Sequence, residues 1–312
     1  MGILILVILI MSSTFANTAI KSQENVKATK ITQEEVIDNP TLKTMSGSLN
    51  RISFYSRFTY RGSSLKDPIS AERPNLREIS ATPSLVNMSG VFGLKYRLSK
   101  QDNISLQMGV YSTTPFHSSI DTENDSNKND FEKNGQKTTS DDPLVSYFRT
   151  YTIGELQNIS FFQYQHITRD IYKEYGGKGI FRFSQASAYR VNKAFYVAAT
   201  LTYENYTYDK DFINYFGKRV SIRSKQREHT YRGNLSAEYY FDRTLSFRFI
   251  TDVFSFVRYR DANSSETVSS QQTIGMTYFF SRDISIAPNV QFIMSDLRSD
   301  RTTTGLNINV NI

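Results

Sequence analysis

The sequence predicts an all-β fold: a transmembrane, up-and-down antiparallel β-barrel of about twelve strands. Three observations lead to this prediction. Many segments alternate apolar and polar residues with a period of two, and the connections between them are alternately short and long. The chain also has 20 Tyr and 22 Phe although its mean hydropathy is only −0.44. Barrel strands have such a composition because one face meets lipid and the other a wet interior.

Residues 1–16 are predicted to be a signal peptide. Residues 3–11 form an apolar run that is too short to cross a membrane as a helix, and small residues follow it up to Ala16, the expected cleavage site. No Lys or Arg precedes the run, which departs from the usual signal pattern. A buried strand or short helix at the N-terminus is the alternative.

Residues 17–46 are polar and charged and show little alternation. We expect them to form a periplasmic N-terminal segment, and the sequence leaves open whether this segment enters the mouth of the barrel. Residues 47–312 are predicted to form the outer-membrane β-barrel.

The alternation is clear from the first predicted strand onward. In residues 50–60, Ile52, Phe54 and Phe58 share one face, whereas Arg57 and Thr59 share the other. Similar alternation runs through residues 86–98, 104–111, 195–204, 234–241, 245–253, 273–280 and 284–292. Residues 144–153, 159–170 and 179–191 are also strand-like. The first two leave the facing undecided, because Arg149 and His166 lie among aromatic residues.

The connections predict the topology. Short turns are expected near residues 99–103, 154–158, 192–194, 242–244 and 281–283, and longer loops at 62–82, 117–143, 171–178, 209–227, 261–267 and 296–302. Outer-membrane barrels have short periplasmic turns and longer external loops. An even number of strands then places both termini in the periplasm and the charged 117–143 loop outside the cell.

The last predicted strand carries a family resemblance. Residues 303–312, TTGLNINVNI, resemble the terminal β-signal of outer-membrane barrels, although many bacterial members end in Phe and this chain ends in Ile312. The chain resembles medium-sized, porin-like barrels that include oligosaccharide-specific, acidic-sugar and nucleoside channels. This resemblance implies contact with outer-membrane lipid and lipopolysaccharide, and recognition by the barrel-assembly machinery through residues 303–312. No motif of one subfamily is present.

The predicted inward face is strongly basic. Assigning the polar face of each strand to the interior collects nine basic side chains: Arg51, Arg57, Lys95, Arg97, Arg182, Arg190, Arg232, Arg248 and Arg258. Only Glu204, Glu238 and Asp252 oppose them. Arginine binds carboxylate and phosphate groups well, because its planar fork can donate two parallel hydrogen bonds.

We therefore expect a channel that passes small anionic or sugar-like solutes. The alternative is a structural or surface-interaction barrel that does not conduct, in which the arginines pair with lumen acids and tyrosines. Its loops 62–82, 117–143 and 209–227 would then contact a partner.

Little in the sequence predicts other chemistry. The chain has no cysteine, which excludes disulfides and thiolate ligands, and its three histidines are far apart, so neither a metal site nor a cofactor is expected. His117 and Ser119 have the spacing of the His and Ser of outer-membrane phospholipases, a second alternative. No third group to orient the histidine is evident, and we expect no enzyme. The formal net charge is +7, but basic residues that follow strand periodicity do not indicate nucleic-acid binding.

Overall fold

The computed structural model describes residues 36–76, 84–117, 138–261, 265–267 and 270–312. The predicted signal peptide, most of the predicted N-terminal segment and most of the 117–143 loop lie outside these residues. No helix within the described ranges is both long enough and apolar enough to cross a membrane.

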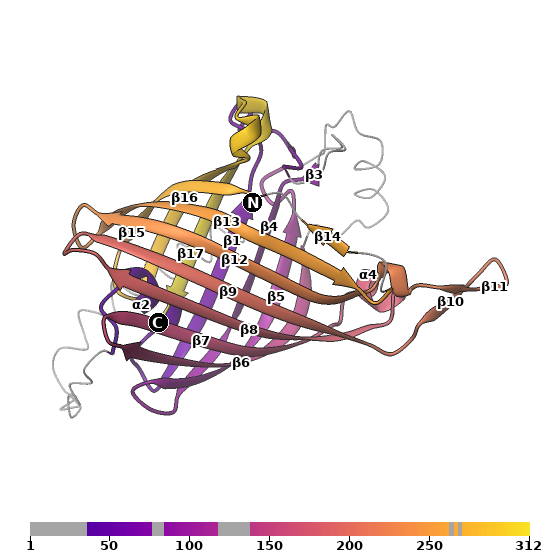
Figure 1. Cartoon of the computed structure of the whole chain (residues 1–312), viewed down its shortest axis with the longest axis horizontal. Coiled ribbons are helices and arrows are strands. Elements are labelled where there is room, and N and C mark those ends of the chain that lie inside the picture. The colour runs from indigo at the N-terminus through magenta and orange to yellow at the C-terminus, as the bar shows by residue number, and fades with distance from the viewer. Residues whose placement is uncertain (1–35, 77–83, 118–137, 262–264, 268–269) are drawn as a thin grey trace. The chain divides into compact units, whose positions relative to one another are not determined.

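Twelve antiparallel strands form one closed barrel, as the sequence predicted (Figure 1). They are β1 (Ile52–Arg61), β4 (Asn87–Arg97), β5 (Asp102–Thr113), β6 (Thr138–Ile153), β7 (Leu156–His166), β8 (Gly177–Arg190), β9 (Phe195–Tyr208), β12 (Arg227–Tyr240), β13 (Leu245–Tyr259), β15 (Gln272–Phe279), β16 (Ile284–Phe292) and β17 (Thr302–Asn311). Each strand pairs with the next, and β1 pairs with β17 from Tyr55–Asn311 to Arg61–Gly305. This last pairing closes the sheet.

The two ends of the barrel differ. At one end, here called the turn end, two to four residues connect strands such as β6–β7 and β8–β9; β1 begins and β17 ends there. The opposite end, the loop end, carries the long connections. These contain the pair β2 (Glu72–Arg73) and β3 (Ser84–Leu85), the hairpin β10 (Phe212–Tyr215) and β11 (Lys218–Ser221), β14 (Ser265–Thr267), α4 (Asp170–Glu174) and the 3-10 turns η1 (Arg223–Lys225), η2 (Met294–Asp296) and η3 (Ser299–Arg301).

One short helix, α2 (Pro40–Ser46), precedes β1. Its start is specified locally: the side chain of Asn39 accepts a hydrogen bond from the Leu42 amide (2.9 Å), and Pro40 occupies the first helical position. The helix ends at Gly47, whose φ of 73° favours glycine.

The strands alternate between an apolar outward face and a polar inward face. Leu94, Leu106 and Leu201 are 53–64% exposed on the outside, whereas Ser105 and Gln107 are at most 5% exposed inside. The two segments whose facing the sequence left undecided also alternate, but both depart from this rule. Phe148 and Phe161 point inward and are buried, and Arg149 and His166 lie outward.

A β-bulge in the middle of β13 reverses the direction in which the later side chains of this strand point. On the neighbouring strand β12, Asn234 pairs with Asp252 but Gly233 pairs with Phe254, which leaves Val253 as an extra residue. One inserted residue moves all later side chains of the strand to the opposite face.

The bulge corrects the predicted position of Arg258, which strict alternation placed inside the barrel. Arg258 pairs across the strands with His229, whose ring contacts Tyr231 on the outward face. Its guanidinium group forms an ion pair with Glu228 at 3.2 Å, and its side chain is 53% exposed. Arg258 therefore cannot line the interior.

The facing of β9 predicts that the same substitution destabilises the barrel to different extents at two adjacent positions. Leu201→Arg places a cation on the lipid-facing side near the middle of β9 and should destabilise the folded barrel by about 2–4 kcal/mol. Thr200→Arg places it in the wet interior and should have a much smaller effect. Reversible unfolding in lipid vesicles measures both free energies, and equal losses would contradict the assigned facing.

Candidate functional site

Residues 36–48, which include α2, lie inside the barrel at the turn end. Their polar contacts come from strands on different sides of the wall: Lys95 on β4, Gln157 on β7, Glu238 on β12 and Asn311 on β17. The segment therefore crosses the interior, and we call it the plug segment.

Hydrogen bonds fix the plug segment along its length. The Lys95 ammonium group donates to the carbonyl oxygen of Ser46 (3.3 Å) and to that of Ser48. The Thr41 hydroxyl donates to the Glu238 carboxylate at 2.8 Å, and the Asn311 side-chain amide donates to the Thr44 carbonyl oxygen, also at 2.8 Å.

Two apolar side chains add to this attachment. Ile37 and Leu42 are each 4% exposed and belong to a buried cluster formed with Phe148, Ile159, Phe161, Ala186 and Ala188 of the barrel wall. The two cavities that border the plug segment at this end measure about 10 and 20 Å³. Such spaces hold about one water molecule and no solute. In this structure the plug segment thus closes the turn end.

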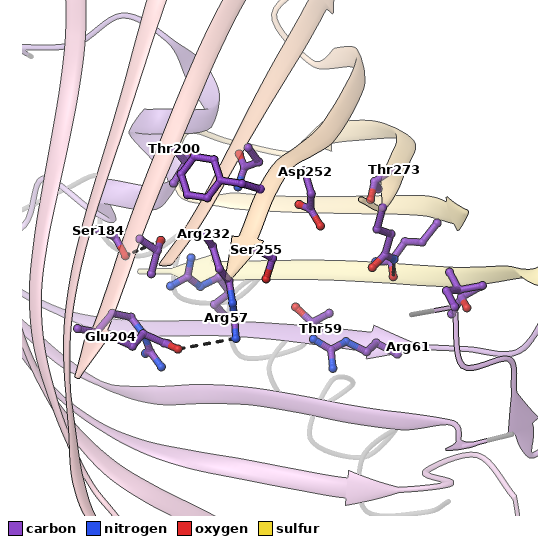
Figure 2. A pocket seen from close by; sticks show the side chains of 18 of the residues that line it. Arg57, Thr59, Arg61, Ser184, Thr200, Glu204, Arg232, Asp252, Ser255 and Thr273 are labelled. Carbon is purple, nitrogen blue, oxygen red and sulfur yellow. Dashed lines mark hydrogen bonds and ion pairs between the residues drawn. The ribbon is translucent and has the colours of Figure 1, made fainter. Parts of the chain in front are cut away.

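A cavity of about 690 Å³ occupies the middle of the barrel (Figure 2). Met45 of the plug segment borders it on one side, and Asn75 and Leu76, from the loop between β1 and β4, border it on another. The barrel wall contributes mainly hydroxyl, amide and charged groups. The charged residues are Arg57, Arg61, Arg73, Arg182, Arg232, Glu204 and Asp252, so cations outnumber carboxylates.

Two of these arginines share one carboxylate. Glu204, which is 4% exposed, accepts a hydrogen bond from Arg182 Nε at 2.6 Å and lies 3.7 Å from Arg232. The Tyr206 hydroxyl donates to the same carboxylate at 2.8 Å. Arg182, Arg232 and Glu204 thus form a compact group with one excess positive charge.

Three other arginines have no carboxylate partner among the described residues. Arg57 and Arg61 project into the cavity from β1, and Arg73 reaches it from β2. The Arg73 Nε atom donates to the carbonyl oxygen of Leu85 (3.1 Å). Burial, and secondarily the positive charge of Arg61, lowers the pKa of Arg73 below its usual value. The cavity therefore holds cations whose charge the described residues leave uncompensated.

The cavity continues toward the loop end. A neighbouring cavity of about 640 Å³ shares Arg182, Glu204 and Arg232 with it, and another of about 560 Å³ shares Arg73 and Asn75. The larger spaces that share residues with the central cavity therefore lie toward the loop end, away from the plug segment.

The nine basic residues predicted from the sequence separate into three groups. Arg57, Arg182 and Arg232 line the central cavity. Four lie at the turn end: Lys95, Arg97, Arg190 and Arg248. Arg190 pairs with Asp38 at 2.9 Å, and Arg97 donates to backbone carbonyl oxygens. Arg248 borders the small cavity beside the plug segment. Arg51 is exposed and donates to the outward-facing Tyr96 at 2.8 Å, and Arg258 faces outward.

Sequence reasoning missed two cavity arginines. Arg61 continues the inward series of Arg57 and Thr59, so extending the alternation to the end of β1 would have found it. Arg73 lies in a loop that folds into the barrel, where no periodic signal exists. The loop is held by the wall, because the Thr304 amide donates to the Ser63 carbonyl oxygen at 2.8 Å.

The predicted pair of His117 and Ser119 is not described as a pair by the structure. The Nε2 atom of His117 is 2.7 Å from the carbonyl oxygen of Ile69, and Ser119 lies outside the described residues. Within the described ranges, no three His, Cys, Asp or Glu side chains are grouped so as to hold a metal ion.

No known family model and no curated protein sequence matches the chain. Among solved structures, the barrel is similar to an outer membrane channel from Pseudomonas putida F1, with a TM-score of 0.51, 12% identity, and coverage of 84% of this chain and 96% of that chain. Weaker similarities are to the NanC porin (TM-score 0.44, 8% identity, 83% and 98% coverage) and to Salmonella typhi OmpF in complex with daunomycin (0.37, 10%, 83% and 97%). The fold is thus a closed antiparallel β-barrel of the kind found in a solved outer membrane channel.

The attachment of the plug segment predicts how it responds to the loss of Lys95. Lys95→Met leaves the carbonyl oxygens of Ser46 and Ser48 without this donor, and loss of a charged hydrogen bond should increase local opening about tenfold. Tryptic cleavage after Lys43 in α2, followed by mass spectrometry, should accelerate accordingly. Lys193→Met, in an exposed turn, is the matched control. Equal cleavage rates in the two variants would show that Lys95 does not hold the segment.

Proposed function

We propose that this protein is an outer-membrane channel for small anionic solutes, closed in this structure by its plug segment. The observation that carries the proposal is the central cavity, where Arg57, Arg61 and Arg73 have no carboxylate partner among the described residues. The similarity to a solved outer membrane channel agrees with it at the level of the fold. In this proposal the turn end faces the periplasm, lipopolysaccharide surrounds the loop end, and the assembly machinery binds the strand at residues 303–312.

Anion preference follows from the size and charge of the lumen. A passing ion stays within about one Debye length, roughly 8 Å at physiological salt, of the wall. Low-dielectric walls concentrate the field of uncompensated cations, which enriches anions and depletes cations. Arginine is suited to this role because it remains charged even when it is partly buried.

Passage requires the plug segment to move. Its attachment consists of side-chain hydrogen bonds, the ion pair between Asp38 and Arg190, and two buried apolar side chains, Ile37 and Leu42. No backbone pairing with the strands is present among its described contacts. Such an attachment can open without unfolding the barrel, because the sheet is closed independently by β1 and β17.

The closed turn end also favours a second candidate function. If the plug segment never leaves, the barrel does not conduct and its loops serve as an interaction surface. The exposed hairpin β10–β11 at the loop end, with Phe216 at 89% exposure, offers such a surface. We propose no catalytic activity under either candidate function.

Removing the plug segment distinguishes between an anion channel and a non-conducting interaction barrel. A form lacking residues 17–46 should show a higher single-channel conductance in planar bilayers than the full chain, because the turn end is then open. Heat-modifiable electrophoretic mobility verifies that the shortened barrel is folded. A folded barrel without conductance would contradict the channel and support the interaction surface.

The preference of the channel for anions over cations should depend on where an arginine lies and not on the net charge of the protein alone. Arg57→Glu changes the formal charge of the cavity by two units and should shift the reversal potential under a salt gradient toward cations. Arg258→Glu makes the same change on the outward face and should leave the potential nearly unchanged, since water and ions screen exposed charges. The same shift from both substitutions would contradict a role for the cavity.

A further inference from the structure

The uncompensated arginines occupy two places along the cavity. Arg57 and Arg61 lie on the same face of β1, four residues apart, which separates their Cα atoms by about 13 Å. Figure 2 shows Arg57, Thr59 and Arg61 in this order along the strand. Arg73, which reaches the cavity from β2, lies close enough to Arg61 to be affected by its positive charge. One cationic position thus surrounds Arg57 and a second surrounds Arg61.

The wall around these positions is rich in neutral hydrogen-bonding groups. They include Thr59, Ser184, Thr200, Thr202, Asn234, Ser255, Thr273, Gln291 and Thr303. Thr303 is 1% exposed, and its hydroxyl oxygen has no hydrogen-bond partner within the described structure. The Thr303 hydroxyl oxygen is too buried to bond a ligand in the cavity, whereas the half-buried Thr59, Ser184 and Thr202 can present their hydroxyls to one.

The cavity has five arginines and two carboxylates, a formal excess of three positive charges, and the arginines without a carboxylate partner stand at two positions, which set the valence of a matching ligand. Glu204 already compensates one of the two arginines that contact it, and Asp252 is the remaining carboxylate of the cavity. A monoanion can engage one of the two cationic positions and leaves the other uncompensated. A ligand with one anionic group at each end can engage both.

We propose that the cavity binds polyhydroxylated dianions, such as sugar diacids, with one anionic group at Arg57 and the other at Arg61 and Arg73, and that its hydroxyl and amide groups bind the hydroxylated chain between them. This inference rests on the proposed anion channel and specifies its solute. Because the cavity continues toward the loop end, binding does not require the plug segment to move.

Four six-carbon compounds test the proposal on the full-length protein. D-glucarate has two carboxylates and four hydroxyls, D-gluconate has one carboxylate, adipate has two carboxylates without hydroxyls, and sorbitol has no charge. Isothermal titration calorimetry in detergent at low salt should give D-glucarate an affinity about tenfold higher than that of D-gluconate or adipate. Sorbitol should show no measurable binding.

Substitutions at the two positions should remove this preference. Arg57→Gln and Arg61→Gln should each weaken D-glucarate binding about tenfold and bring it close to that of D-gluconate, because one charge-assisted contact is lost. Arg258→Gln, on the outward face, is the matched control and should bind as the unaltered protein does. If Arg57→Gln does not fold, Arg57→Lys keeps the charge, loses the planar fork, and should still weaken binding.

The possible results distinguish the failure of the dianion site from the failure of the proposed channel function. Equal affinities for D-glucarate and D-gluconate, or an Arg61→Gln variant with unaltered affinity, would overturn the dianion site even if the barrel conducts anions. Selective D-glucarate binding by a barrel that never conducts after removal of residues 17–46 would support the site and overturn the channel.

Discussion

The pairing of β1 with β17 is the constraint on which the rest of the structure depends. A sheet in a lipid environment cannot leave an edge with unpaired amide and carbonyl groups, so its first and last strands must meet. Here strands from opposite ends of the described chain pair over seven registered positions, from Tyr55–Asn311 to Arg61–Gly305. Closure by twelve strands fixes the width of the lumen, and this lumen accommodates both a short helix and a cavity of about 690 Å³.

The basic residues inside this lumen have two different roles. At the turn end, Lys95 donates to backbone carbonyl oxygens of the plug segment and Arg190 pairs with Asp38, so both cations bind the plug segment. In the central cavity, Arg57 has no such partner among the described residues. A charge is stable in that position only if water or an anion solvates it. The same residue types therefore attach the plug segment at the turn end and make the central cavity electropositive.

The sequence predicted the barrel, its strand number and most of its facing, because period-two alternation is a property of each strand by itself. It could not predict the bulge at Val253, since an inserted residue is visible only against the partner strand, and so it misplaced Arg258. It identified Arg57, Arg182 and Arg232 but missed Arg73, which reaches the cavity from a folded-in loop. The position of α2 depends on contacts with distant residues such as Glu238 and Asn311, which no local pattern encodes.

Thiol labelling inside the central cavity tests most directly whether this cavity is electropositive and closed by the plug segment, because the chain contains no cysteine that would give a background signal. A Thr59→Cys thiol lies between Arg57 and Arg61 on the inward face of β1. The account predicts that an anionic methanethiosulfonate reagent added from the loop end modifies this thiol at least about tenfold faster than a cationic one, and that neither reagent reaches it from the turn end. Faster reaction with the cationic reagent, or ready access from the turn end, would contradict an electropositive chamber closed by the plug segment.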